Sequence, residues 1–330
     1  MFVKGLQEAE VLAKGVTQGC DVVMYTTVFY AKGIFLADPR RRCKHEWMEG
    51  HEDLGRLCCV LVTGRSSAKA LLNTYKTTRF RPWRLLVMDV PNFSADTGRY
   101  WSRVFKLLSH RLFTTVNVTI FVDWKLELQQ DPRLLVNKTI VQQNATFSAW
   151  RHPCATMYPV TIKSNCASRE SHLPWIFHEV GFLRFLKKSH PEKVGNWTAL
   201  ELQEERYKQL QLEGKLKFEH FLEGGVLIRD SRSKIVRDVN ELWWAEYTKK
   251  DSSDRDQLSL AFALNTVVKE AREHAAKMAA IMAAMPKLGN VVGLCGFVFL
   301  VFGIVGMELF KGALHYRCTT GPGFRETAGH

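Results

Sequence analysis

Short apolar runs that favour β-strands recur along the first 230 residues. Val, Ile, Leu and Phe dominate them, without the strict alternation of a sheet that has one wet face, so we expect strands buried on both faces. The runs cover residues 21–30, 57–64, 84–91, 118–128, 145–150 and 224–230.

Helical patterns lie between several of these runs. The range 198–214 begins at Thr198, has Glu201 three residues on as in a capping box, and ends at Gly214. The range 99–113 places four apolar residues at helical spacing, namely Trp101, Phe105, Leu108 and Leu112. Alternating strands and helices predict an α/β sandwich with a mostly parallel sheet over residues 21–265. Residues 1–20 read as a helical or frayed lead-in.

The pattern changes after about residue 265. Residues 266–287 are rich in Ala and Met and predict an amphipathic linker helix, which we expect to break at Pro286. Residues 288–307 carry no charge and are long enough for a bilayer core of about 30 Å, so a transmembrane helix is predicted over 288–310. The alternative is a buried core helix. Residues 311–330 form a tail.

Composition and charge narrow the class of protein. The 46% hydrophobic and 24% charged residues exclude a disordered chain, and a mean hydropathy of −0.15 excludes a polytopic membrane protein. The net charge of +13 favours an anionic partner such as acidic lipid, nucleic acid or a sugar nucleotide, although a solvated basic surface explains it equally well. No zinc-finger spacing or lysine-rich arm is present, so no nucleic-acid partner is expected.

The 8 cysteines include no C-x-x-C pair, which argues against a structural zinc site. Cys58 and Cys59 are adjacent in an apolar run, and we expect them on opposite faces of a strand. Cys154 and Cys166 flank a predicted loop and can pair in an oxidising compartment. Buried free thiols are the commoner state of such cysteines.

Four N-x-T sequons, at Asn117, Asn137, Asn144 and Asn196, exceed the roughly one that composition gives by chance. They indicate exposure to the lumen of the secretory pathway. Asn117 and Asn144 adjoin predicted strands, so we expect them to be the poorer acceptors. The first residues contain no apolar stretch long enough for a signal peptide.

The segment VTIFVDWKLELQQDP places Asp123 directly after a buried strand, with Lys125 two residues on. Ligands of open α/β sheets bind beyond the carboxyl ends of strands. A carboxylate there can hold a ribose hydroxyl or a divalent cation, Mn²⁺ or Mg²⁺, and a lysine can neutralise a phosphate. A plain turn residue is the alternative for Asp123.

A second polar group follows two adjacent tryptophans, Trp243 and Trp244. One of them can enter the core while the other stacks on a sugar ring. Arg255, Asp256 and Gln257 stand just before an apolar helix. Asp256 can act as a base or bind an acceptor hydroxyl, or it can simply cap that helix.

Three further polar residues belong to the candidate set. Lys106 and His110 are four apart on the predicted 99–113 helix and so share a face. His152 follows a predicted strand. Each histidine alone is more typical of a structural role.

In their order, several segments resemble a family of glycosyltransferase-like proteins known from plant turgor-defect and seed-mucilage proteins and their bacterial relatives. The resemblance covers roughly residues 20–265. It is carried by FKLLSHRLF, VTIFVDWKLELQQDP, NATFSAWRHP, LQEERYKQLQLEG, FLEGGVLIRDSRSKIVRDVNELWWAEY and SDRDQLSLAFAL.

This resemblance implies a nucleotide-diphospho-sugar transferase (GT-A type) fold and a role in Golgi glycan synthesis. By this resemblance Asp123 falls where such transferases keep their metal-binding acidic motif, and Asp256 falls on another of its polar motif positions. For sugar transfer we expect both to be catalytic, with Asp123 holding the metal or the ribose and Asp256 acting as a base or binding the acceptor hydroxyl. Donor or phosphate binding falls to Lys106, His110, Lys125 and Arg255, and sugar or acceptor contact to His152, Trp243, Trp244 and Gln257. The sequence departs from the family at Trp124, which is bulky, and over 153–197.

The C-terminal segment MPKLGNVVGLCGFVFLVFGIVGMELFKGALHYRC resembles something else, the linker and fifth transmembrane segment of voltage-gated calcium or sodium channels. It covers about residues 266–318, without a voltage sensor or pore loop. The two resemblances conflict, because the channel linker is cytosolic whereas the transferase family acts in the lumen.

The sequence thus predicts a single-pass, membrane-anchored glycosyltransferase of the Golgi or endomembrane system. Its partners would be a nucleotide sugar and a glycan or other hydroxyl acceptor. The alternatives are a channel-related fragment or fusion that carries an inactive α/β module, and an inactive sugar-nucleotide-binding protein.

Overall fold

A computed structural model describes residues 2–29, 42–49, 52–77, 80–89, 95–151, 175–189 and 195–316. His152, Cys154 and Cys166 lie outside these residues. The chain divides into two compact units, Met1–Lys269 and Glu270–His330. The first contains the sheet and all the candidate site residues that the structure describes.

A 6-stranded sheet in the order β3-β2-β1-β4-β6-β5 organises the first unit. The four strands from β3 to β4 run parallel, whereas β6 is antiparallel to both β4 and β5. The prediction of an α/β fold with a mostly parallel sheet is confirmed, and every predicted strand run overlaps one of the strands. The strands are β1 (Val22–Val28), β2 (Leu57–Gly64), β3 (Arg84–Met88), β4 (Val118–Val122), β5 (Phe147–Arg151) and β6 (Leu222–Asp230).

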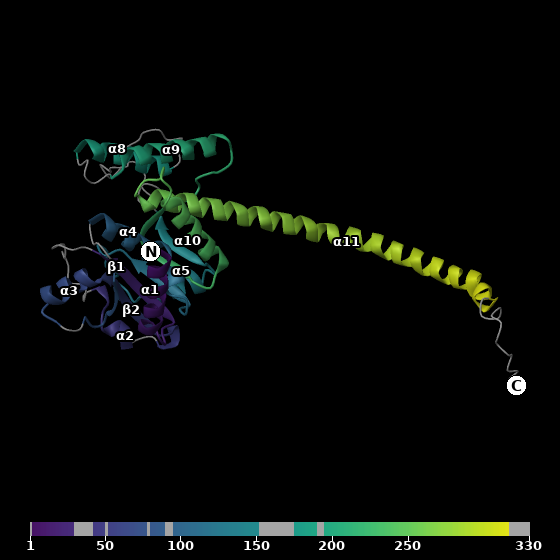
Figure 1. Ribbon diagram of the computed structural model, residues 1–330, viewed down its shortest axis with the longest axis horizontal. Coiled ribbons are helices and arrows are strands. Elements are labelled where there is room, and N and C mark those ends of the chain that lie inside the picture. Colours follow the sequence, from purple (N-terminus) through teal and green to yellow (C-terminus); the bar gives the residue numbers. More distant parts are fainter. Residues whose placement is uncertain are drawn as a thin grey trace. The chain divides into compact units, whose positions relative to one another are not determined.

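Helices connect the strands and cover both faces of the sheet (Figure 1). They are α1 (Phe2–Val16), α2 (Glu46–Glu49), the 3₁₀ helix η2 (Glu52–Leu54), α3 (Arg65–Thr74), α4 (Ala95–Leu107), α5 (Ser109–Leu112), α6 (Pro132–Val136), the π-helix η3 (Asn137–Val141), α8 (Trp175–Ser189), α9 (Trp197–Leu212), α10 (Lys234–Tyr247) and α11 (Asp256–Tyr316).

Two apolar layers bury the sheet between them. Helices α1, α4, α5, α10 and the start of α11 pack on one face, where Tyr25 of β1 and Trp243 of α10 are both fully buried. Helices α2, α3 and α6 pack on the other face, around Met24 of β1 and Trp47. Since successive residues of a strand point to opposite faces, β1 and β2 have to be apolar on both sides. Their sequences are apolar apart from the buried threonines Thr26, Thr27 and Thr63.

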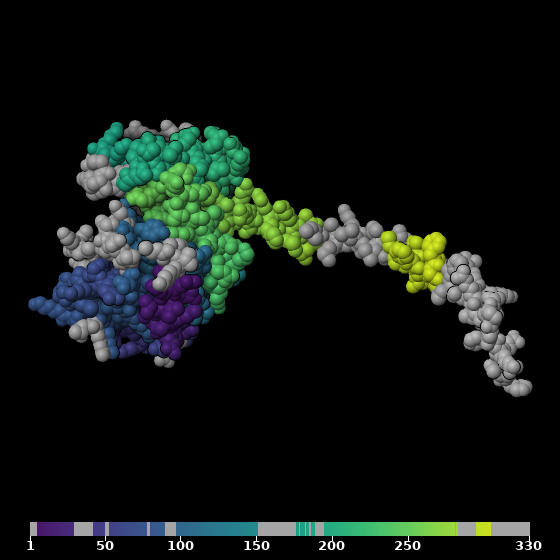
Figure 2. All heavy atoms as spheres, viewed as in Figure 1, coloured from purple at the N-terminus to yellow at the C-terminus, as the bar shows by residue number. Residues whose placement is uncertain are grey.

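A third apolar cluster joins α8 and α9 to the first turns of α11. The described atoms of these segments adjoin one another in Figure 2. Its buried members include Phe177, Tyr207 and Leu258. Tyr207 donates its hydroxyl hydrogen to the carboxylate of Glu246 at 2.9 Å, which ties α9 to α10. The cluster therefore holds the helices after β5 against the beginning of α11.

Two helix predictions need local revision. The predicted 99–113 helix is divided into α4 and α5 at Leu108. Helix α9 begins one residue before Thr198, because Asn196 is its N-cap and accepts a hydrogen bond from the Ala199 N–H at 3.1 Å. The lead-in is helical over Phe2–Val16.

The end of the chain also differs from the prediction. Helix α11 continues through Pro286, where a break is expected, since a proline removes only one hydrogen bond from a helix of this length. Within the side chains that the structure describes, no helix is both long and apolar enough to cross a membrane. The predicted span at 288–310 is therefore not supported. Side chains are described only for its residues 295–304, a helical length of roughly 15 Å.

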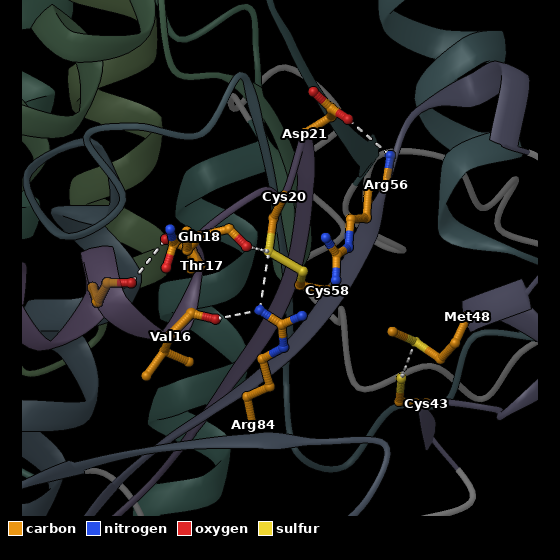
Figure 3. The surroundings of a disulfide bond; sticks show 11 residues. Val16, Thr17, Gln18, Cys20, Asp21, Cys43, Met48, Arg56, Cys58 and Arg84 are labelled. Atoms are coloured by element: carbon orange, nitrogen blue, oxygen red, sulfur yellow. Dashed lines mark hydrogen bonds between the residues drawn. A yellow bond between two sulfur atoms is a disulfide. The ribbon is translucent and has the colours of Figure 1, made fainter.

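Two disulfides fix β2 to the segments on either face of the sheet. Cys58 pairs with Cys20, just before β1, and Cys59 pairs with Cys43, with Cα–Cα distances of 5.8 and 6.4 Å. Figure 3 shows the first, with the Arg84 guanidinium donating to the Cys20 sulfur at 3.5 Å. The expected opposite orientation of Cys58 and Cys59 is confirmed, but their expected free thiols are not, because each faces a partner cysteine within bonding range.

We predict that each disulfide stabilises the first unit by restricting the unfolded chain. Removing the 38-residue link with Cys20→Ala and Cys58→Ala should lower the free energy of unfolding by about 4 kcal/mol, and removing the 16-residue link by about 3 kcal/mol. Urea unfolding measures both values.

The matched control for this prediction is Cys295→Ser, because Cys295 is a free, exposed cysteine among the residues described. It should leave the unfolding midpoint unchanged. Equal midpoints for the unaltered chain and both pairs of variants would contradict the stabilising role.

Candidate functional site

The carboxyl end of β4 meets the amino end of β6, because the two strands are antiparallel neighbours. Asp123 follows the last residue of β4, and its N–H donates to the carbonyl of Gly225 at 2.7 Å. The first residues of α11 lie at the same edge, since the Gln257 amide donates to the carbonyl of Leu222 at 2.7 Å. Residues from β4, β6 and α11 are thus brought together there.

A buried ion pair lies at the centre of this edge. The Lys106 ammonium of α4 donates to the Asp256 carboxylate of α11 at 2.6 Å, with side chains only 5% and 10% exposed. Arg103, one turn earlier in α4, contacts the other carboxylate oxygen at 3.2 Å. The ammonium also lies 5.1 Å from the ring centre of Phe121 and 5.6 Å from that of Trp243. Aromatic faces on two sides therefore compensate part of the lost hydration.

The neighbouring cations Lys106 and Arg103 favour the ionised form of Asp256. Burial raises the pKa of the Asp256 carboxyl, but Arg103 and Lys106 outweigh it, so the pKa lies below its usual value. Burial lowers the pKa of Lys106, which Asp256 opposes. An aspartate held ionised by two cations is a weak base, so Asp256 is better suited to hold Lys106 and Arg103 than to accept a proton.

Gly224 allows Lys106 to reach this position. A Cβ at residue 224 would lie 2.9 Å from the Lys106 ammonium nitrogen and 3.9 Å from the side-chain oxygen of Gln257. Any larger residue would displace the ammonium or the strand. The glycine is needed for the close approach of side chains to the β6 backbone.

Two glutamates differ from Asp256 in their ionisation. Burial raises the pKa of Glu179 to about 6, which Arg255 opposes and Glu223 reinforces. Burial also raises the pKa of Glu223, with Asp256 and Asp123 acting in the same direction and Lys106 against it. Glu179 comes from α8 and Glu223 from β6. The site therefore combines an ionised aspartate with two carboxyls that hold a proton more strongly, the arrangement that separates acid and base roles.

Asp123 is half-buried and Lys125 is exposed. One carboxylate oxygen of Asp123 accepts the Lys125 N–H at 3.0 Å, which orients the carboxylate at the end of the strand. The described residues contain no group of three or more His, Cys, Asp or Glu arranged to hold a metal ion. Asp123 and Glu223 offer two carboxylates at this edge, a donor set that suits a cation completed by phosphate oxygens and water.

Trp124, the bulky departure from the resembled family, contacts a cation. The Arg42 guanidinium lies over its ring, 4.7 Å from the centre. Burial lowers the pKa of Arg42, while Glu127 and Asp123 raise it. A second basic residue thus stands beside Asp123.

His110 belongs to a different polar cluster, between α5 and α10. Its Nε2 lies 2.7 Å from the Glu241 carboxylate and its Nδ1 lies 3.2 Å from the Asn240 amide nitrogen. Asn240 accepts from the fully buried Arg229, which also donates to the Lys106 carbonyl and the Tyr25 hydroxyl. His110 therefore joins α5 to α10, and its link to Lys106 runs through the Asn240 and Arg229 side chains to the Lys106 backbone carbonyl.

The two tryptophans differ in exposure, as expected. Trp243 is fully buried and donates its Nε1–H to the Asp256 carbonyl at 2.7 Å, so it cannot stack on a sugar. The prediction of sugar contact is wrong for this residue, because its ring supports Lys106 from within the core. Trp244 is half-buried, and its ring packs against Tyr100 and Tyr247.

The structure therefore brings together Lys106, Asp256, Gln257 and, through shared electrostatic contacts, Asp123 and Arg255. It places His110 and Trp244 in other contacts, and His152 lies outside the described residues. Sequence reasoning missed Glu179, Glu223, Gly224 and Arg103. Glu223 and Gly224 lie within the segment FLEGGVLIRD that carries the family resemblance, which was the available signal.

Comparison with known proteins gives two separate sequence matches. A probable hexosyltransferase, MUCI70 of Arabidopsis thaliana, is 39% identical over 70 residues, which are 21% of this chain and 12% of that protein. The voltage-dependent T-type calcium channel subunit alpha-1G of Rattus norvegicus is 53% identical over 38 residues, 12% of this chain and 2% of the channel. The chain thus matches a small part of each curated relative.

Among solved structures, mouse xyloside xylosyltransferase 1 aligns over 73% of this chain and 80% of its own, with a TM-score of 0.33 and 13% identity. The WbbM bifunctional glycosyltransferase aligns over 75% of this chain and 38% of its own, with a TM-score of 0.37 and 11% identity.

The family comparison covers far more of the sequence than either relative. The model of the TOD1/MUCI70 glycosyltransferase-like domain matches residues 14–281, which include the whole sheet and every residue of the site. The chain therefore belongs to the TOD1/MUCI70 glycosyltransferase-like family.

Proposed function

We propose that this chain transfers a sugar from a nucleoside-diphosphate donor to the hydroxyl of a glycan or another acceptor, on a GT-A type α/β domain. The observation that carries the proposal is the group of charged side chains at the edge formed by β4 and β6. There the buried Lys106–Asp256 pair keeps Asp256 ionised, whereas the pKa values of Glu179 and Glu223 are raised. Family membership supports the same reaction class.

The reaction sets the demands on the site. A bond forms between the acceptor oxygen and the anomeric carbon, the bond from that carbon to the diphosphate breaks, and the nucleoside diphosphate leaves with the electron pair. The site has to neutralise the leaving diphosphate and accept the proton of the acceptor hydroxyl.

We assign the diphosphate to the basic and metal-binding side of the edge. Arg255 and Lys125 would contact phosphate oxygens, and Asp123 with Glu223 would hold Mn²⁺ or Mg²⁺. When bound, the cation would neutralise charge on the leaving diphosphate. Lys106 acts as a positioning residue, because its ammonium is bound to Asp256 and nearly without exposure.

The proton is assigned to Glu179. Its raised pKa places it close to the range in which a carboxylate is an effective base, unlike the ionised Asp256. Glu179 lies in the range that follows the resembled family poorly, which fits a residue that faces a variable acceptor.

An oxidising lumen, as in the Golgi, is the compartment we propose. The two disulfides support it, because disulfides form and persist in such compartments.

We predict that Asp123→Asn lowers kcat/KM for sugar transfer by about 100-fold or more, because it removes a charge that holds the cation against the diphosphate. A panel of sugar nucleotides, assayed for release of nucleoside diphosphate with Mn²⁺, Mg²⁺ or a chelator, measures this. Asp53→Asn, at an exposed residue outside the site, is the control and should be silent. If no donor is turned over or bound by the unaltered chain, the proposed function fails.

A second prediction separates stability from function in the buried pair. Asp256→Asn leaves Lys106 as a buried, unpaired charge and should reduce the free energy of unfolding by about 3–5 kcal/mol. Adding Lys106→Met removes that charge and should recover most of the stability. Sugar transfer should be lost in the single variant and in the double variant.

Urea unfolding and the transfer assay, run on the single and double variants, test this prediction. Recovery of transfer together with stability would show that the pair only stabilises the fold, contrary to our assignment.

A third prediction concerns pH. The Glu179 carboxyl is protonated below about pH 6 and ionised above it, so a base at this position makes kcat/KM rise with pH through about 6. Glu179→Gln should lower the rate and abolish this rise. The exposed Glu201→Gln of α9 is the matched control and should keep the profile of the unaltered chain. An unchanged acid limb in the Glu179 variant would exclude Glu179 as the base.

A further inference from the structure

The four N-x-T sequons occupy different structural settings. Asn117, Asn144 and Asn196 are exposed, whereas Asn137 is half-buried. An N-linked glycan is bulky and polar and has to project into solvent from its asparagine. Exposure alone therefore reduces the four sequons to three.

Asn117 and Asn144 lie at one edge of the sheet although they are far apart in sequence. The Asn117 carbonyl accepts the N–H of Ser231 at 2.9 Å, and Thr146, two residues after Asn144, accepts the N–H of Asp230 at 2.9 Å. Both sequons thus flank the carboxyl end of β6.

Neither asparagine side chain has another use within the part of the chain that the structure describes, where neither makes a hydrogen bond or an ion pair. Asn144 adopts a φ of +48°, in the left-handed region that asparagine and glycine occupy more readily than other residues. Its side chain therefore stands on an exposed turn. The expectation that Asn117 and Asn144 are the poorer acceptors rests on the adjoining strands, and it stays a prediction that exposure alone does not test.

The other two sequons have structural roles. Asn137 lies where α6 passes into the π-helix η3, and the hydroxyl of Thr139 in its sequon donates to the Leu135 carbonyl at 2.7 Å. Asn196 caps α9, and its neighbour Gly195 packs so closely on the Asp254 carboxylate that a Cβ there would lie 2.4 Å from an oxygen. Asn196 therefore lies close to the start of α11 and to the proposed site.

We propose that Asn117 and Asn144 are the N-glycan acceptors among the residues that the structure describes. A further sequon, N-F-S at Asn92, lies outside those residues. The donor would be an oligosaccharide on a lipid diphosphate, supplied by the oligosaccharyltransferase of the host. A bond forms between the Asn amide nitrogen and C1 of the first sugar, the bond from C1 to the diphosphate oxygen breaks, and the lipid diphosphate leaves with the electron pair. The amide nitrogen gives up one of its two protons.

The burial of Thr119 determines when during folding the glycan can be added to Asn117. Thr119 of the Asn117 sequon is fully buried in β4, so the folded chain cannot present its hydroxyl to an enzyme. The glycan at Asn117 must be added before β4 joins the sheet. The exposed Asn117 then leaves the sugar outside the core.

Two independent features agree with this proposal. The disulfides Cys20–Cys58 and Cys43–Cys59 require the oxidising conditions that prevail where such glycans are added. The sequons also lie at the edge opposite the proposed site, since Asn117 and Asp123 stand at the two ends of β4, about 20 Å apart. Glycans there leave the site open, and the proposal does not depend on the proposed function.

The full chain, expressed in cultured animal cells, tests this proposal. Peptide N-glycosidase in ¹⁸O-water converts each glycosylated Asn to a labelled Asp, which peptide mass spectrometry locates. We expect the label at Asn117 and Asn144. This measurement on the unaltered chain does not depend on the folding of any variant.

Variants then assign the change in gel mobility. Asn117→Gln and Asn144→Gly should each remove one glycosidase-sensitive step, and the pair should remove both; glycine keeps the left-handed turn. Thr146→Ser preserves the sequon and should change nothing, as should Asn73→Gln at an exposed asparagine outside any sequon. Absence of glycosidase-sensitive mobility, or label at Asn137 or Asn196 with none at Asn117 and Asn144, would overturn the proposal.

Discussion

The ion pair between Lys106 and Asp256 joins α4, which packs on the sheet, to the first turn of α11. A charge buried this deeply is tolerated only with a partner, so α4 and the first turn of α11 cannot move apart without a large cost. The same constraint requires glycine at 224 and places Gln257 on the carbonyl of Leu222. Arg229 extends the network, because it binds the Lys106 carbonyl and the Tyr25 hydroxyl within the core. The geometry of the proposed site follows from these contacts.

The disulfides stabilise the half of the sheet that the ion pair does not reach. Adjacent cysteines of β2 send one bond to each face, so the strand is fixed to the end of the α1 connection and to the segment before α2. The first unit is thus held covalently at β2 and electrostatically between α4 and α11. Neither of these two disulfides lies at the carboxyl end of a described strand, where polar side chains can serve a ligand.

Local patterns predicted the strands well, because burial on both faces requires predominantly apolar runs such as Leu57–Gly64. They also located Lys106, Asp123 and Asp256. They could not assign roles, since the ionisation of Glu179 depends on burial and on Arg255, which is distant in sequence. The pairing of Cys20 with Cys58 likewise depends on which strands are neighbours. Trp243 shows what residue type alone does not reveal. It stands beside a polar motif in the sequence, yet its side chain is buried in the core.

A structure of the chain bound to an intact nucleoside-diphosphate sugar tests the central claim most directly. Our account predicts that the diphosphate lies at the carboxyl end of β4, within reach of Asp123, Glu223 and Arg255, while Lys106 remains on Asp256. A donor bound at another surface, or a Lys106 ammonium that leaves Asp256 for the phosphate, would contradict the account.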